Sequence, residues 1–122
     1  MLEIINQELN KLKLFKELNQ ISKKKINESS KILTYDVGQI IISSQNIPDK
    51  VFVIIEGEAR LIGVNNNKPN TIVKFERGSI LGIGSILRVS AFEQINASTV
   101  VKAIAISDEV KEWINNLNSS LK

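Results

Sequence analysis

The chain has 122 residues, of which 43% are hydrophobic and 24% are charged, the composition of one soluble globular domain. It contains no Cys and no His, which excludes disulfide scaffolds, the usual zinc sites, thiol nucleophiles and catalytic triads. The net charge of +3 comes from the first 31 residues, which hold seven Lys and four Glu. Because the Arg residues are scattered, we predict no nucleic-acid partner. We also predict no metal, no cofactor and no enzymatic activity.

The first segment carries an apolar stripe with spacings of three and four, formed by Leu2, Ile5, Leu9, Leu12, Phe15 and Leu18. This spacing predicts an amphipathic helix over residues 2–21. The stripe must be covered, and we favour packing on the rest of the domain over pairing in a homodimer. We expect the helix to end before Lys23-Lys24-Lys25, and this lysine run to be a solvated loop, with contact to anionic lipid headgroups or a partner as the alternative.

Short apolar runs divided by Gly, Asn, Pro and Asp replace the helical period from residue 31 to residue 106. They predict strands at 32–35, 39–43, 51–56, 59–64, 71–75, 80–81, 97–101 and 103–106. The turns between them include a six-residue polar turn at 65–70. Many short strands separated by turns of this kind are typical of a sandwich, barrel or jelly roll.

The last segment predicts a short helix over residues 108–118, capped by Ser107 and carrying Trp113 as a packing anchor. The linker-like composition after it leads us to expect a fragment of a longer protein. Apolar runs stay shorter than the roughly 18 residues that cross a bilayer, so we expect a cytoplasmic location.

Three stretches resemble the cyclic nucleotide-binding domain family: Gly38-Gln39-Ile40-Ile41, the run VFVIIEGEA at 51–59, and the run GSILGIGSIL at 78–87. The third is similar to the segment that opens the family's phosphate-binding cassette. The resemblance implies a single domain over residues 1–122, mainly β with flanking helices. Its centre is a double-stranded β-helix, or jelly-roll, barrel at 31–106.

The same resemblance implies a pocket for the phosphate of a cyclic nucleotide. In the family, a Glu after the second Gly of the cassette accepts hydrogen bonds from the ribose, and a later Arg contacts the phosphate. Here Ile83 follows Gly82, and Ile95 stands at the position of the Arg. The loss of two charged contacts would weaken a micromolar ligand to millimolar or worse, so cyclic nucleotide binding is expected to be weak or absent.

The residues left at this vestigial site are Gly82, Ile83, Gly84, Ser85, Arg88, Ala97 and Ser98. We favour a regulatory or interaction domain in which isoleucines fill the pocket. The alternative is a sensor of cyclic AMP or cyclic GMP in which Arg88 and the amides of Gly84 and Ser85 hold the phosphate. An enzyme of the cupin type shares the barrel, but this chain has no His to form the usual metal site of such an enzyme, which argues against that function.

A narrower resemblance concerns the runs EARLIG at 58–63, TIVKFERGSILG at 71–82, SILR at 85–88 and AST at 97–99. They look like the N-terminal cyclic nucleotide-binding-like domain of cyanobacterial peptide or toxin secretion ABC transporters. This implies a bacterial parent protein with its domain on the cytosolic face of the inner membrane, and membrane contact through that parent. A transcription regulator of the catabolite-activator type, with a helix-turn-helix module after the barrel, stays open as another parent.

Overall fold

The computed structural model describes residues 2–11, 13–46, 48–65, 68–82 and 94–106. Within this part of the chain, three helices come first: α1 (Leu2–Leu9), α2 (Lys13–Lys16) and α3 (Gln20–Ser29). Eight strands follow: β1 (Lys31–Tyr35), β2 (Ile40–Ile42), β3 (Val51–Glu56), β4 (Ala59–Asn65), β5 (Lys68–Phe75), β6 (Ile80–Leu81), β7 (Ile95–Ala97) and β8 (Val101–Ile106). The strands span the range predicted for the barrel.

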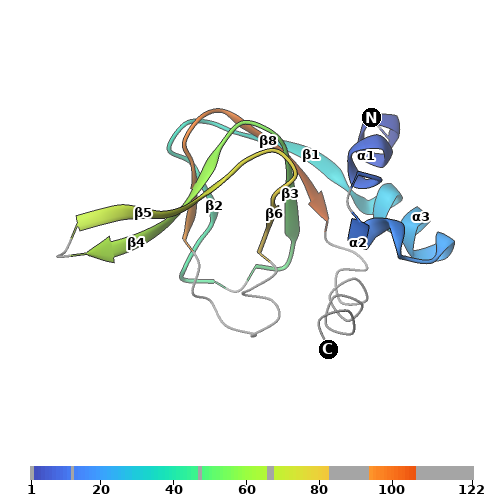
Figure 1. Ribbon diagram of the computed structural model, residues 1–122, viewed down its shortest axis with the longest axis horizontal. Coiled ribbons are helices and arrows are strands. Elements are labelled where there is room, and N and C mark those ends of the chain that lie inside the picture. The colour runs from blue at the N-terminus through green and yellow to red at the C-terminus, as the bar shows by residue number, and fades with distance from the viewer. Residues whose placement is uncertain (1, 12, 47, 66–67, 83–93, 107–122) are drawn as a thin grey trace.

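The strands form two antiparallel sheets of four, in the orders β1-β8-β3-β6 and β2-β7-β4-β5. Chain neighbours such as β3 and β4, or β7 and β8, lie in different sheets, so the chain crosses repeatedly from one sheet to the other. Figure 1 shows the sheets enclosing the barrel, with the β4–β5 hairpin extending on the side away from the helices. This arrangement confirms the predicted jelly roll.

The helices cover the outer face of the first sheet. Five apolar residues of the helices and their connections are buried against that sheet: Ile5, Leu9, Phe15, Leu18 and Ile26. They meet Val51 and Val53 of β3 and Ile104 and Ile106 of β8. Packing on the domain, favoured over a helix pair between two copies, is therefore the use that the structure makes of the stripe.

The single helix predicted over residues 2–21 is wrong, because three shorter helices fold across the sheet. A straight helix of that length would be about 30 Å long, whereas four strands about 4.8 Å apart are far narrower. The backbone carbonyl of Asn19 accepts the N–H of Lys23 at 3.0 Å, which starts a new helical turn. The lysine run consequently lies in α3 and not in a loop.

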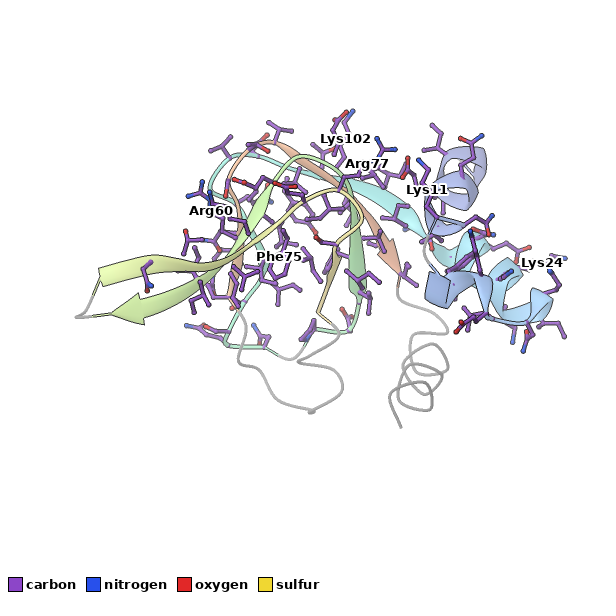
Figure 2. All side chains as sticks on the ribbon, viewed as in Figure 1. Lys11, Lys24, Arg60, Phe75, Arg77 and Lys102 are labelled. Atoms are coloured by element: carbon purple, nitrogen blue, oxygen red, sulfur yellow. The ribbon has the colours of Figure 1, made fainter. Side chains whose placement is uncertain are left out.

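One ion pair ties the helices to the barrel at its surface. Arg77 of the β5–β6 turn donates to the Glu8 carboxylate of α1 at 2.5 Å, and Lys11 donates to the same oxygen at 3.3 Å. Arg77 and Lys11 lie side by side between the barrel and the helices in Figure 2.

Three predicted strand boundaries are corrected. The strand predicted at 97–101 is β7 at Ile95–Ala97, because the N–H groups of Ser98 and Thr99 donate to the carbonyl of Glu58 at 2.9 and 3.3 Å, which holds the chain in a turn between the sheets. The strand predicted at 103–106 begins two residues earlier, as β8 at Val101. The predicted turn at 65–70 is mostly strand, since β4 and β5 pair as far as Asn65 and Lys68. The helix predicted at 108–118, with Trp113, lies outside the described residues.

Candidate ligand site

The interior of the barrel is lined by apolar side chains from both sheets. The buried members of this lining are Ile41, Ile42, Phe52, Ile54, Ala59, Leu81, Ile95, Ala97, Val101, Ala103 and Ala105. Leu33, Tyr35, Leu61 and Phe75 pack against them from partly buried positions. We call this set the barrel lining. It forms because alternate residues of each strand point to the same face of the sheet.

Ile95 is the residue of the barrel lining that bears most directly on ligand binding. It begins β7, pairs with Ile42 of β2 and Leu61 of β4, and is 0% exposed. The resemblance places the phosphate-contacting Arg of the family at this position. In this protein the position is an apolar contact between three strands, so it supplies no positive charge to a ligand.

Gly82 begins the candidate site at the end of β6, in a left-handed conformation with φ of +97°. A Cβ there would stand 3.1 Å from the carbonyl oxygen of Lys50 and 3.2 Å from Cδ1 of Ile42, so glycine suits both the turn and the tight space. Gly82 and Ile95 therefore both approach Ile42, so the structure brings the predicted site residue Gly82 and the residue at the family's Arg position to the same end of the barrel.

Ala97 and Ser98 lie further along, at the other end of β7. The Ala97 backbone exchanges hydrogen bonds with the turn before β2: its N–H donates to Gln39 at 2.9 Å and its carbonyl accepts from Gly38 at 2.8 Å. Ser98 donates its N–H to Glu58. These two residues are occupied in holding turns together. The remaining predicted site residues, Ile83, Gly84, Ser85 and Arg88, lie outside the described residues.

Charged side chains within the described ranges stay out of the barrel lining. Arg60 of β4 pairs with Glu58 at 3.3 Å and Lys102 of β8 pairs with Glu56 at 3.6 Å, both beside the β3–β4 turn. Figure 2 shows Arg60 and Lys102 on the outside of the barrel, whereas Phe75 lies inside it. The one buried polar residue of the described part is Ser30, which follows α3.

Tyr35 is the polar residue of the barrel lining that the sequence analysis did not single out. Its ring packs edge-to-face on Phe52, with centroids 6.1 Å apart, and burial raises the pKa of its phenol. The alternation of Leu33 and Tyr35 on β1, with every second residue toward the interior, is the signal that identifies it. A neutral phenol offers a ligand a hydrogen bond but no compensation for a phosphate charge.

The described residues contain no group of three or more Asp and Glu residues placed to hold a metal ion. The described helices include none that is long and apolar enough to cross a membrane.

The comparisons with known proteins identify the fold. No protein-family model and no curated protein matches the chain. Among solved structures, the regulatory domain of Toxoplasma gondii PKA with cAMP is similar, with a TM-score of 0.83 and 13% identity over 98% of this chain. So is the regulatory subunit of a cAMP-independent protein kinase A from Trypanosoma cruzi bound to guanosine, with a TM-score of 0.84 and 18% identity over 98% of this chain.

A third similar structure is a cyclic nucleotide-binding-like protein from Brucella abortus, with a TM-score of 0.71 and 19% identity over 90% of this chain and 96% of its own. The chain spans only 48% of the Toxoplasma structure and 44% of the Trypanosoma structure. These likenesses establish the fold of a cyclic nucleotide-binding domain.

Proposed function

We propose that this chain is a regulatory or interaction domain that keeps the cyclic nucleotide-binding fold without the charged contacts of the family's phosphate site. The observation that carries this proposal is the complete burial of Ile95 among apolar side chains of three strands. The resemblance puts the phosphate-contacting Arg there, and the sequence has Ile83 where the family has the ribose-binding Glu.

The physical argument is one of desolvation. A cyclic nucleotide carries a monoanionic phosphodiester, and a charge that leaves water for an apolar interior needs charged or hydrogen-bonding partners. The barrel lining offers apolar surface and the Tyr35 phenol. We propose that the cassette residues Gly82, Ile83, Gly84, Ser85 and Arg88 are a vestige of a nucleotide site, and we assign no catalytic residue to them.

Thermal unfolding with and without nucleotide tests this proposal. A ligand with a Kd of about 1 μM, added at about 1 mM, stabilises a folded domain by about 4 kcal/mol. In a domain of this size, that would raise Tm by more than about 10 °C. We expect no such rise with cyclic AMP or cyclic GMP, and a rise of that size with either nucleotide would contradict the proposal.

Two arginine variants would show which residue is responsible if a nucleotide did raise Tm. Arg88→Ala removes the cation of the cassette, and Arg77→Ala is the matched control, since Arg77 pairs with Glu8 at the surface. A nucleotide effect that Arg88→Ala abolishes and Arg77→Ala preserves would establish the alternative function, a cyclic nucleotide sensor built on Arg88. We expect neither the parent chain nor either variant to respond to the nucleotides.

We further propose that the domain serves a peptide or toxin secretion ABC transporter, as its N-terminal part on the cytosolic face of the membrane. The four runs quoted above support this assignment, and transport and ATP hydrolysis would belong to other domains of that protein. The coding sequence downstream of codon 122 is the test. Membrane spans followed by an ATP-binding cassette are expected, and a helix-turn-helix module would contradict the assignment.

A further inference from the structure

The outer side of α3 combines lysines with an exposed isoleucine. Ile21, Lys24 and Lys25 stand at positions i, i+3 and i+4 of this helix and therefore share one side of it. Ile21 is 70% exposed, more than any other large hydrophobic residue of the described part, and Lys24 and Lys25 are exposed as well. We call these three residues the lysine face. Most of the surface of this apolar side chain is therefore in contact with solvent.

The buried side of the same helix explains why the lysine face points outward. Ile26 is 0% exposed and joins Phe15 and Leu18 in the core beneath the helices. The Lys23 ammonium lies 5.9 Å from the centre of the Phe15 ring, at the margin of that core. Once these contacts fix the rotation of α3, its lysine face is directed to solvent. Figure 2 shows Lys24 at the extremity of the molecule, beyond the helices and away from the barrel.

The charges near the lysine face are of both signs, with a positive excess. Glu28 follows one turn after Lys24 on α3, and Glu17 precedes the helix; both are exposed. Lys23, Lys24 and Lys25, with the exposed Lys16 and Lys31 on the neighbouring elements, outnumber these two acids. The basic excess of the whole chain therefore lies in its first 31 residues, which include the helices, whereas the basic and acidic residues of 32–122 are equal in number.

The chemistry of these side chains favours a lipid surface. An ammonium on a flexible stem attracts diffuse negative charge, whereas the planar guanidinium of Arg is suited to bidentate recognition of single groups. The described Arg residues, Arg60 and Arg77, both pair with glutamates of the same chain. Basic side chains beside an exposed apolar side chain combine the electrostatic and hydrophobic attractions that hold helices at the surface of an anionic bilayer.

We propose that the lysine face docks on an anionic lipid bilayer, with Lys24 and Lys25 at the headgroups and Ile21 entering the acyl boundary. The inference goes beyond the proposed function and stands whether or not the barrel binds a nucleotide. It also needs no other domain of a parent protein, because the residues concerned all lie on α3.

Vesicle flotation of the 122-residue chain tests the proposal. The probe is phosphatidylglycerol mixed with phosphatidylcholine, compared with phosphatidylcholine alone. We expect binding to the anionic vesicles and little to the neutral ones, with the anionic binding lost at about 0.5 M salt, where charges are strongly screened. Equal binding to both vesicles, or none to either, would overturn the proposal.

Matched variants separate the lysine face from net charge. Lys24→Gln/Lys25→Gln should lower the vesicle partition coefficient about 30-fold, because each lysine near an anionic surface contributes roughly a fivefold factor. The control Lys74→Gln/Lys102→Gln removes the same charge from the barrel and should change the coefficient less than about threefold. An equal loss in both variants would overturn the assignment of the face.

Two further measurements complete the test. Ile21→Ser should weaken vesicle binding by about tenfold without lowering Tm, since the side chain is exposed. Unchanged vesicle binding by this variant would contradict the insertion of Ile21. Binding of the parent chain to polyglutamate with no flotation on anionic vesicles would overturn the lipid surface in favour of an acidic protein.

Discussion

The two sheets of the barrel have different environments. The first, β1-β8-β3-β6, packs against the helices outside and carries barrel-lining residues inside, so its strands β8 and β3 are largely buried, whereas its edge strand β1 is partly exposed. The second, β2-β7-β4-β5, buries its inner face, and its edge strand β5 is exposed from Asn70 to Lys74. We call them the covered sheet and the open sheet.

The sequence reflects this difference strand by strand. The covered strands β3 and β8 are nearly continuous apolar runs, VFVIIE and VKAIAI, because both faces need apolar side chains. On the open sheet, β4 alternates between the buried Ala59, the partly exposed Arg60 and the lining residue Leu61. The N-terminal helices are therefore part of the core, and we expect substitutions beneath them to cost more stability than substitutions on the outer face of the open sheet.

Removing the helix contact should have the largest effect. Phe15→Ala deletes a fully buried ring from the core beneath the helices, and we expect a loss of about 3 to 5 kcal/mol in the free energy of unfolding. Ile4→Ala on α1, where the side chain is 49% exposed, is the control and should cost less than about 0.5 kcal/mol. Chemical denaturation measures both, and equal values would show that the helices are not part of the core.

Replacing one isoleucine in each sheet by alanine compares how much stability the two positions contribute. Ile104→Ala in β8 of the covered sheet should cost about 2 to 5 kcal/mol, since the side chain is 0% exposed. The same change at Ile40 in β2 of the open sheet, where the side chain is 51% exposed, should cost less than about 1 kcal/mol. A loss at Ile40 as large as that at Ile104 would contradict the distinction between the sheets.

Substitution of glycine in the β3–β4 turn, which connects the two sheets, should cause the next largest loss of stability. Gly57, in the turn from β3 to β4, has φ of +94°, and a Cβ there would collide with the carbonyl oxygen of Val100. Gly38 has φ of +85° with open space around it, so a side chain there would meet the unfavourable backbone conformation but no collision. We expect Gly38→Ala to cost about 1 kcal/mol and Gly57→Ala about 2 to 3 kcal/mol. Equal thermal unfolding of the two variants would rule out the close contact.

The smallest predicted effect is the alkaline sensitivity of Tyr35, whose ring belongs to a covered strand but faces the barrel lining. Burial raises its pKa in the folded state, so the folded chain keeps the proton at a pH where the unfolded chain has lost it. Stability should therefore fall as pH rises above about 10, the unfolded value. Tyr35→Phe should reduce this fall, and an unchanged dependence of unfolding on alkaline pH would contradict the prediction.

The chain offers an internal check on that titration. Tyr35 is its only tyrosine, so the phenolate absorbance of the parent chain reports this one group. The Tyr35 phenol should ionise at a higher pH in the folded chain than in the denatured chain. A folded phenol that ionises together with the denatured one would contradict the burial of the ring.

The sequence was sufficient to predict a domain of many short strands, because turns with Gly and Asn and strands of alternating or continuous apolar residues are local patterns. The choice of a jelly-roll barrel among the possible β architectures came from the family resemblance. The sequence was insufficient for the N-terminal helices. Spacing along residues 2–21 is the same for one helix as for three, and the break depends on the size of the sheet beneath them. The strand boundary at Ala97 depends likewise on Glu58, which is distant in sequence and accepts the N–H groups of the turn.

The candidate site was predictable to a different extent at each residue. The left-handed Gly82 follows from a Gly at the end of a short strand, and its approach to Ile95 through Ile42 required the structure. The burial of Ile95 agrees with its apolar character. Its place in the fold was predicted wrongly, because the strand expected to begin at Ala97 begins at Ile95, the first residue of β7. The roles assigned to Ile83 and Arg88 stay predictions.

Isothermal titration of the purified chain with cyclic AMP and cyclic GMP, up to millimolar concentration, tests the central claim most directly. The apolar barrel lining and the buried Ile95 predict no saturable heat with either nucleotide. Saturable binding with a micromolar Kd would contradict the account, because it would require a cation to reach the phosphate from the cassette.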